Sequence, residues 1–378
     1  MLFPPIHGRK HSEPYMNINI WTLKDLSHAE KARILKRAEA DIEDVSDIVR
    51  PILEDVKTRG DDALIDYARK FDKADVSSGL KATDTDFAKA YEALDDDLIE
   101  AIKICAENVR IHHRQQMDRI DLQWLEEVQP GQFAGEKITP IPSVGLYVPR
   151  GKGAFPSAMY MLCIPAKIAG VENIAVCTPP KPDGDFDAAS LVAADICGVR
   201  DVYKVGGAQA IAALAYGTET VPKVVKVEGP GSPYVSAAKR LLSDIIHPGM
   251  PAGSSESLIL ADDSADPWNT ALDMVSEAEH GSDSASVLVT TSRLLADKVT
   301  KHLEEIINSL PKERQRYCED VFANYGGIII CDTMDESIVF TNEYAAEHMQ
   351  IKTGDPEAIL KRITNAGEIV IGETTTFV

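Results

Sequence analysis

Hydrophobic positions follow a helical period in the first third of the chain. Between Asp95 and Gln116, apolar residues recur every three or four positions, which predicts an amphipathic helix. Upstream, Arg59-Gly60-Asp61 predicts the end of one helix and the N-cap of the next. Residues 25–118 are therefore expected to be mostly helical. The residues before about position 20 include three prolines and show no periodicity, so we expect a loose arm there.

From residue 143 onward, short apolar runs alternate with helical segments. Such runs are typical of strands buried on both faces, and their alternation with helices predicts parallel sheets. The expected strands cover 144–148, 174–177, 202–205 and 224–227 in a first series, then 257–260, 287–290, 328–331 and 369–371 in a second. The expected helices cover 156–169, 187–197, 208–215, 267–280, 293–309, 336–343 and 356–365.

The two series of strands predict an α/β fold with two Rossmann-like domains and a helical N-terminal segment. Each domain is expected to contain an incomplete, parallel sheet. We expect the N-terminal segment to cover residues 1–44. The first α/β domain is expected to combine residues 45–146 with 257–378, and the second to cover 147–256.

Charge and cysteine usage narrow the classes of function. The chain of 378 residues has a net charge of −21 at pH 7, so neither nucleic acid nor an anionic membrane is expected as a partner. No apolar run approaches the ~18 residues of a membrane span. The six cysteines form no CxxC pair, and residues 1–16 contain no apolar signal-peptide core. These features predict reduced thiols in a cytoplasmic protein.

The predicted helix over 267–280 carries the first candidate site. Asp266 is expected to cap it, and the spacing of Glu277 and His280 places both side chains on one face. A carboxylate oxygen and an imidazole nitrogen are ligands that zinc or manganese accepts. The alternative is an ordinary solvated face, because an apolar stripe lies opposite, formed by Trp268, Ala271, Leu272 and Val275.

Glycine-rich loops after two predicted strands suggest a nucleotide or phosphate site. Gly206-Gly207 opens one helix, and Gly229-Pro230-Gly231 leads to Ser232 as the N-cap of another. Glycines allow backbone N–H groups to approach an anion at a helix N-terminus, although such loops often only form tight turns. Tyr147 ends a strand nearby and is either a cofactor contact or an ordinary strand-end tyrosine.

Two further segments carry polar groups suited to chemistry. The loop Gly253-Ser254-Ser255-Glu256 precedes a strand, and we expect it in the crevice where α/β sheets usually bind ligands. Glu347-His348 combines an acid with an imidazole, so that one group can activate water while the other shuttles a proton. A Glu-His dipeptide by itself is common and not diagnostic.

Taken in order, these segments resemble the histidinol dehydrogenase family, from about residue 45 to the end of the chain. The matching stretches are VKTRGDDALIDYARKFDK (56–73), VGLYVPRGKGAFPSAMYMLCIPAKIAGV (144–171), GGAQAIAALAYGT (206–218), EGPGSPYVSAAKR (228–240), PAGSSES (251–257), SEAEHGSDS (276–284) and NEYAAEH (342–348). Ordered agreement of this kind is specific.

The resemblance implies a homodimer that uses NAD and zinc to oxidise an amino alcohol, L-histidinol by default, through the aldehyde to the carboxylate. It implies a general base at His348 and a group that acts on water at Glu347. The other implied positions are Tyr147, Gln209 and Ser232 for NAD, Glu277 and His280 for zinc, and Ser255, Glu277, His280 and His348 for substrate.

Several departures mark the chain as a divergent member that is short at its C-terminus. Glu277 stands where the family has a zinc-binding Gln, Ser232 where it has Asn, and Ser254 where it has Pro. The chain ends at Val378, before an Asp and a His that complete the family's zinc site. Tight zinc binding by these residues alone is therefore not expected.

Three other functions stay open on the sequence. A paralogue acting on another amino or sulfonated alcohol is compatible with Glu277 and the altered loops. A metal-independent NAD(P) reductase or hydrolase is a second possibility, and its activity would resist chelation. A truncated binding or oligomerisation module is the third, and it is favoured by the missing ligands.

Overall fold

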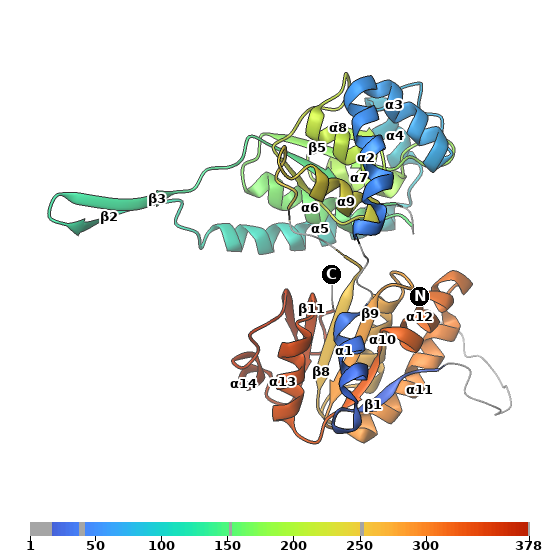
Figure 1. Cartoon of the computed structure of the whole chain (residues 1–378), viewed down its shortest axis with the longest axis vertical. Helices are drawn as coiled ribbons and strands as arrows, with labels where there is room; N and C mark the ends of the chain where they lie inside the picture. Colours follow the sequence, from blue (N-terminus) through green and yellow to red (C-terminus); the bar gives the residue numbers. More distant parts are fainter. Residues whose placement is uncertain (1–16, 38–41, 151–152, 250–252, 377–378) are drawn as a thin grey trace. The chain divides into compact units, whose positions relative to one another are not determined.

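The computed structural model describes residues 17–37, 42–150, 153–249 and 253–376. The chain divides into two compact units (Figure 1). Unit 1 comprises Met1–Glu39 and Ser254–Val378, and unit 2 comprises Ala40–Gly253. Both contain a parallel sheet between helices, which confirms the predicted α/β class with two Rossmann-like domains.

Unit 2 contains a four-stranded parallel sheet in the order β6-β5-β4-β7. Its strands are β4 (Ser143–Tyr147), β5 (Asn173–Thr178), β6 (Val202–Lys204) and β7 (Lys226–Glu228), close to the four predicted runs. One face is covered by α2 (Ile42–Arg59), α3 (Asp61–Tyr67), α8 (Gly207–Tyr216) and α9 (Pro233–Leu241). The other is covered by α4 (Asp84–Glu92), α5 (Asp96–Met117), α6 (Pro156–Ile168) and α7 (Ala188–Ile196).

The division into units differs from the predicted one. Residues 45–146, which we expected to join 257–378, lie in unit 2, because α2 packs on α8 and α9 while α5 packs on α6 and α7. The N-terminal segment is not a separate arm in its described part. There β1 (Ile20–Thr22) pairs in parallel with β10 (Gly327–Ile330), the short 3-10 helix η1 (Leu23–Asp25) follows, and α1 (His28–Lys36) packs on the unit 1 core.

Unit 2 also contains an antiparallel hairpin that the sequence did not predict. β2 (Gln123–Gln129) pairs with β3 (Gln132–Lys137), and every residue of both strands is exposed. The hairpin extends as an arm beyond the end of α5 (Figure 1). Since no other described element covers it, this arm lacks the packing that normally stabilises a two-stranded ribbon.

Unit 1 contains a six-stranded parallel sheet in the order β1-β10-β9-β8-β11-β12. Its other strands are β8 (Glu256–Ala261), β9 (Ala285–Thr290), β10 (Gly327–Ile330), β11 (His348–Lys352) and β12 (Glu368–Ile371). One face is covered by α10 (Pro267–Ala278), α11 (Arg293–Ser309) and α12 (Lys312–Asn324). The other is covered by α1, α13 (Met334–Tyr344) and α14 (Pro356–Leu360).

The strand order reverses direction once in each sheet, between β4 and β7 in unit 2 and between β8 and β11 in unit 1. In a doubly wound sheet, connections on opposite faces leave a crevice at this switch point, outside the carboxyl ends of the strands. Unit 2 follows that rule for its candidate cofactor residues, and unit 1 departs from it.

Candidate active site

In unit 2, Tyr147 occupies the carboxyl end of β4, next to the switch point. Its ring is buried, and its hydroxyl oxygen accepts a hydrogen bond from the Gly207 backbone N–H at 3.0 Å. Burial raises the pKa of Tyr147 to about 12, so the hydroxyl stays protonated at neutral pH. Tyr147 therefore bridges the end of its strand to the first turn of α8.

The loop after β7 lies against the same tyrosine. Gly229 has a φ of +113°, and a Cβ atom there would lie 2.1 Å from the Tyr147 carbonyl oxygen. Only glycine allows this approach of two backbones. Lys239, a buried cation that the sequence did not single out, donates from Nζ to the Gly229 carbonyl at 2.5 Å. Burial lowers the pKa of Lys239, while Glu228 partly opposes this shift.

The other two predicted cofactor residues lie at the same edge of the sheet. Gln209 is buried in the first turn of α8, and its Oε1 lies within 2.8 Å of the Cβ position of Gly207. Ser232 is exposed at the N-cap of α9, where its side chain makes no capping bond. Tyr147, Gln209 and Ser232 thus follow three strands whose carboxyl ends meet at one edge.

Asp72 is a further charged group near Tyr147 that the sequence did not reveal. Burial raises its pKa to about 6, and the charge of Arg150 offsets part of the shift. Among the described residues, its Oδ2 has no hydrogen-bond partner. The residue ends η2, the helical turn Ala68–Asp72, and no local pattern connects it with β4.

In unit 1, the candidate residues gather at the amino ends of the strands. β8, β11 and β12 begin side by side, with His348 in register with Ser257 and with Glu368. The expectation that the Ser254-Ser255-Glu256 loop lies in the usual carboxyl-end crevice is therefore wrong. The loop precedes its strand, and in a parallel sheet all strand starts lie at the opposite edge.

His348 is held by a carboxylate on the neighbouring strand. Its Nδ1 lies 2.9 Å from Glu368 Oε2, and its Nε2 lies 3.9 Å from Glu347 Oε2. Burial lowers the pKa of His348, but the bond to Glu368 and the charges of Glu347 and Glu277 outweigh burial and raise it above its usual value. The carboxylate at Nδ1 fixes the orientation of the ring, and Nε2 is the ring nitrogen that lies 3.9 Å from Glu347.

Glu347 is a half-buried acid beside this imidazole. Burial raises its pKa, with the charge of Glu277 adding to the rise, whereas His348 and a hydrogen bond from the Glu256 backbone N–H lower it. The predicted acid–imidazole pair is therefore brought together with Glu277, a residue from another element. Titratable groups whose environments perturb one another in this way are typical of acid–base sites.

The solvated-face alternative for α10 is wrong for Asp273 and Glu277, whereas the His280 side chain just after the helix is 50% exposed. Glu277 is 1% exposed and Asp273 is buried, whereas Trp268 and Leu272 of the supposed core stripe are exposed. The reason is the alternation of β11: Met349 and Ile351 join the core on the α13 side, so that His348, Gln350 and Lys352 face α10. The polar face of α10 packs against that polar face of β11, and Lys352 Nζ lies 2.7 Å from Asp273 Oδ2.

Glu277 and His280 meet as the spacing predicted, although α10 ends at Ala278 and His280 follows in the exit turn. His280 Nδ1 lies 3.2 Å from Glu277 Oε1. Two ligand atoms of one tetrahedral zinc ion, each about 2.0–2.1 Å from the metal, would lie about 3.3 Å apart. The pair thus fits two positions of a zinc site, while no group of three or more His, Cys, Asp or Glu side chains is arranged for a metal within the described ranges.

Ser255 and Ser254 border the same edge of unit 1. The Ser255 carbonyl accepts from the Ala285 N–H at 3.0 Å, which ties the loop to the start of β9. Ser254 Oγ donates to Asp283 Oδ2 at 2.7 Å. The loop is therefore held at both of its serines, and the hydroxyl of Ser255 is half-buried beside Glu256.

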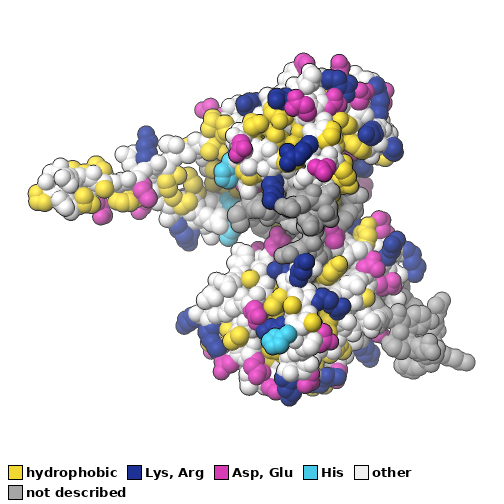
Figure 2. Space-filling model, in the orientation of Figure 1, with side chains coloured by type: hydrophobic (Ala, Val, Ile, Leu, Met, Phe, Trp, Pro, Cys, Tyr) yellow, Lys and Arg dark blue, Asp and Glu magenta, His cyan; other side chains and the backbone are white. Residues whose placement is uncertain are grey.

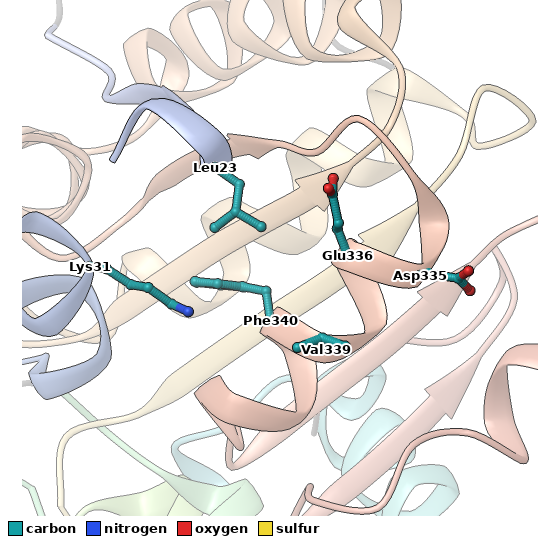
Figure 3. A pocket seen from close by; sticks show the side chains of 6 residues that line it. All are labelled: Leu23, Lys31, Asp335, Glu336, Val339 and Phe340. Atoms are coloured by element: carbon teal, nitrogen blue, oxygen red, sulfur yellow. The ribbon is translucent and has the colours of Figure 1, made fainter. Parts of the chain in front are cut away.

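A shallow apolar depression in unit 1 lies apart from these residues (Figure 3). It is formed by η1, α1 and α13 and lined by Leu23, Lys31, Asp335, Glu336, Val339 and Phe340. Lys31 reaches over the Phe340 ring at 6.0 Å and pairs with Glu343 at 2.6 Å. It contains none of the predicted site residues, and we assign it no role in the chemistry.

Comparison with known proteins gives a consistent picture. The family model described as histidinol dehydrogenase matches residues 35–378. The chain is 47% identical to a histidinol dehydrogenase from Synechocystis sp., over 94% of this chain and 82% of the relative. It is 46% identical to a histidinol dehydrogenase homolog from Colwellia psychrerythraea, over 95% and 80%. The crystal structure of histidinol dehydrogenase from Elizabethkingia anophelis matches with a TM-score of 0.89 at 33% identity, over 96% of this chain and 82% of that one.

Proposed function

The chain belongs to the histidinol dehydrogenase family of oxidoreductases, and we propose that it oxidises a primary amino alcohol, L-histidinol by default, to the carboxylate through the aldehyde. Two successive NAD molecules are the proposed oxidants. The observation that supports this reaction most directly is the His348 imidazole, held through Nδ1 by Glu368 and flanked by the half-buried acid Glu347.

The first oxidation needs a base for the hydroxyl proton of the alcohol. His348 is suited to this role, because Glu368 orients the imidazole through Nδ1 and stabilises its protonated form. NAD, when bound, supplies the acceptor for the hydride. Tyr147, Gln209 and Ser232 are the proposed contacts for it, at the edge of unit 2 where the glycine loops expose backbone N–H groups.

The second oxidation needs water to add to the aldehyde. Glu347 is the proposed base for this water, because burial raises its pKa toward the range in which a carboxylate accepts a proton near neutrality. Ser255 and Glu277 are proposed to contact substrate at the same edge of the sheet. Glu347 Oε2 lies 3.9 Å from His348 Nε2, so the two proposed proton-transfer groups are neighbours.

Glu277 and His280 are the proposed zinc-binding residues of this chain. A zinc ion, when bound, polarises the substrate oxygen. Metal analysis of the purified protein tests the assignment: Glu277→Ala is expected to lower the zinc content, while Glu279→Ala, which changes the half-buried carboxylate two residues further on, is expected to retain it. Equal zinc in both variants would remove Glu277 from the ligand set.

The reaction is tested by following NADH formation with L-histidinol, zinc and NAD. Wild-type protein is expected to form two NADH per histidinol, and His348→Asn is expected to lose ~10²–10⁴-fold in kcat. Arg362→Ala, which removes an exposed ion pair with Asp335 in the same unit, serves as the control. The absence of turnover with histidinol and with a panel of primary alcohols would reject the function.

A second candidate is the same oxidation of another primary alcohol that carries an amino group. The observation that favours it is Glu277, a fully buried carboxylate where the family usually carries a neutral Gln. The added negative charge favours a cationic group on the substrate over an anionic one. Relative kcat/KM values for histidinol and for other primary alcohols of either charge decide between the candidates.

We also propose a homodimer, supported by the hairpin arm. Leu125 is 67% exposed, and Val128 and Phe133 are exposed on the same ribbon, where Figure 2 shows hydrophobic side chains along its length. An exposed apolar ribbon of this kind marks an interface. In light scattering, Leu125→Glu/Phe133→Glu is expected to be a monomer and Leu294→Glu, at an exposed position of α11, to remain a dimer. A monomeric wild type would contradict the proposal.

The cytoplasm is the proposed location. Five cysteines are buried as free thiols, namely Cys163, Cys177, Cys197, Cys318 and Cys331. Burial raises their pKa values, which keeps them protonated and unreactive. Separately, none of the described helices is long and apolar enough to cross a membrane.

A further inference from the structure

Arg37 has an unusual backbone at the end of α1. Its φ is +56° and its ψ is −151°, a combination that favours glycine over any residue with a side chain. The backbone N–H of Arg37 still donates to the Arg33 carbonyl at 3.2 Å, so the distortion begins where the helix ends. A non-glycine residue persists in this conformation only when its side chain makes contacts that outweigh the strain.

Those contacts are made with two residues at the amino edge of the unit 1 sheet. Arg37 Nη1 donates to Glu256 Oε2 at 2.5 Å and to the Tyr344 carbonyl at 3.1 Å. Its guanidinium also stacks over the Tyr344 ring, 4.7 Å from the centroid. The Arg37 and Glu256 side chains are 19% and 27% exposed, so the pair is largely withdrawn from solvent. A planar guanidinium suits both a carboxylate and a ring face, which an ammonium does not.

Glu256 connects this pair to the proposed acid–base residues. Its backbone N–H donates to the Glu347 carboxylate, and its side chain accepts from Arg37. Tyr344 ends α13 just before Glu347, so Arg37 also holds the segment through which the chain enters β11. The guanidinium thus fixes both sides of Glu347: the strand that donates to it and the turn that precedes it.

The negative charges at the amino edge of the unit 1 sheet give a second reason for a cation at Arg37. Glu277, Glu347 and Glu368 place three carboxyl groups around the half-buried imidazole, and Glu256 adds a fourth carboxyl group at the start of the neighbouring strand. Each lies on a different element or strand end, and like charges this close repel. Arg37 contacts one of them, Glu256, and supplies a compensating positive charge.

We propose that Arg37 is a positioning residue for Glu347 and His348, acting through Glu256 and the Tyr344 turn. The inference rests on the proposed function, in which Glu347 and His348 perform the proton transfers. A buried ion pair contributes little net stability compared with apolar packing, yet it fixes geometry, and the strained backbone at Arg37 agrees with a contact retained for geometry.

The experiment compares kinetics of the full chain with variants of both partners. Arg37→Ala is expected to lower kcat ~10–100-fold, the loss typical of a small misplacement of reacting groups. Its KM for NAD is expected to stay within about twofold of wild type, because the proposed NAD contacts lie in unit 2. Arg33→Ala, an exposed arginine one turn earlier on α1, is the matched control and should leave kcat unchanged.

A double-mutant cycle separates positioning from general damage. Glu256→Gln is expected to lower kcat as Arg37→Ala does, and the double variant is expected to be no worse than either single one. Losses that multiply, or a kcat of Arg37→Ala equal to wild type, would overturn the inference. If Arg37→Ala fails to fold, Arg37→Lys and Glu256→Gln carry the same test. If the wild-type protein oxidises none of the alcohols, the proposed function is wrong, whatever the Arg37 variants show.

Discussion

Replacing Lys352 with Met is expected to destabilise unit 1 by about 3–5 kcal/mol. The Lys352 side chain is 0% exposed, and its Nζ lies 2.7 Å from Asp273 Oδ2 and 3.2 Å from Glu373 Oε2. These distances are those of an ion pair, although neither contact meets hydrogen-bond alignment. Removal of the ammonium leaves the buried Asp273 carboxylate without compensation, and this residual charge is the source of the loss.

Most of the expected loss of stability in Lys352→Met comes from Asp273, not from Glu373. Asp273 is 11% exposed in its side chain, whereas Glu373 is 33% exposed and can be solvated once the lysine is gone. Glu373 also accepts from the Asp266 N–H at 3.1 Å, a bond that does not depend on Lys352. We therefore expect most of the cost to disappear when Asp273 is replaced as well.

Urea unfolding followed by tryptophan fluorescence measures the effect. Of the three tryptophans, Trp21 and Trp268 lie in unit 1, so a Trp124→Phe background reports unit 1 alone. Asp273→Leu/Lys352→Met is expected to recover most of the stability. Arg362→Met, which breaks the exposed pair with Asp335, is expected to cost less than about 1 kcal/mol. A loss below about 1 kcal/mol for Lys352→Met, or a double variant as unstable as the single one, would refute the reasoning.

Three further outcomes follow from the site. Because Glu368 raises the pKa of His348, the acid limb of kcat/KM should lie above 6.5, and Glu368→Gln should move it to lower pH; an unmoved limb would contradict the assignment of the base. Gly229→Ala should cost more than about 2 kcal/mol and weaken NADH binding measured by fluorescence titration, since its Cβ would lie 2.1 Å from the Tyr147 carbonyl. Tyr147→Phe leaves the Gly207 N–H without its acceptor and should cost about 1–3 kcal/mol in urea unfolding, with a value near zero contradicting the bond.

Some features of this protein follow from the sequence because their causes are local. The Asp266 cap accepts from the Asn269 N–H, and α2 ends at Arg59 just before α3 begins at Asp61, as the residue types predict. Apart from β1 and β11, the strands of both sheets coincide with the predicted apolar runs, since strands buried on both faces need continuous hydrophobic sequence. The loops with Tyr147, Gln209 and Ser232 meet at one edge because each follows a strand of one parallel sheet.

The sequence analysis missed β11 because the polar residues of this strand are buried only through contacts with residues far away in the sequence. β11 alternates His348, Gln350 and Lys352 with apolar residues, and no apolar run marks it. The hairpin arm was missed because none of its residues joins a core within the described chain.

The sequence alone determined most of the helices and the apolar strands, because that choice depends on neighbours within a few positions. Tertiary structure decided that Glu277 is buried, since the cation that matches the polar face of α10 is Lys352 on β11. It also decided that Glu368 holds His348 and that Arg37 holds Glu256, pairs formed across adjoining elements. Such pairing depends on which strands become neighbours, and the hydrophobic periodicity of the sequence does not specify that.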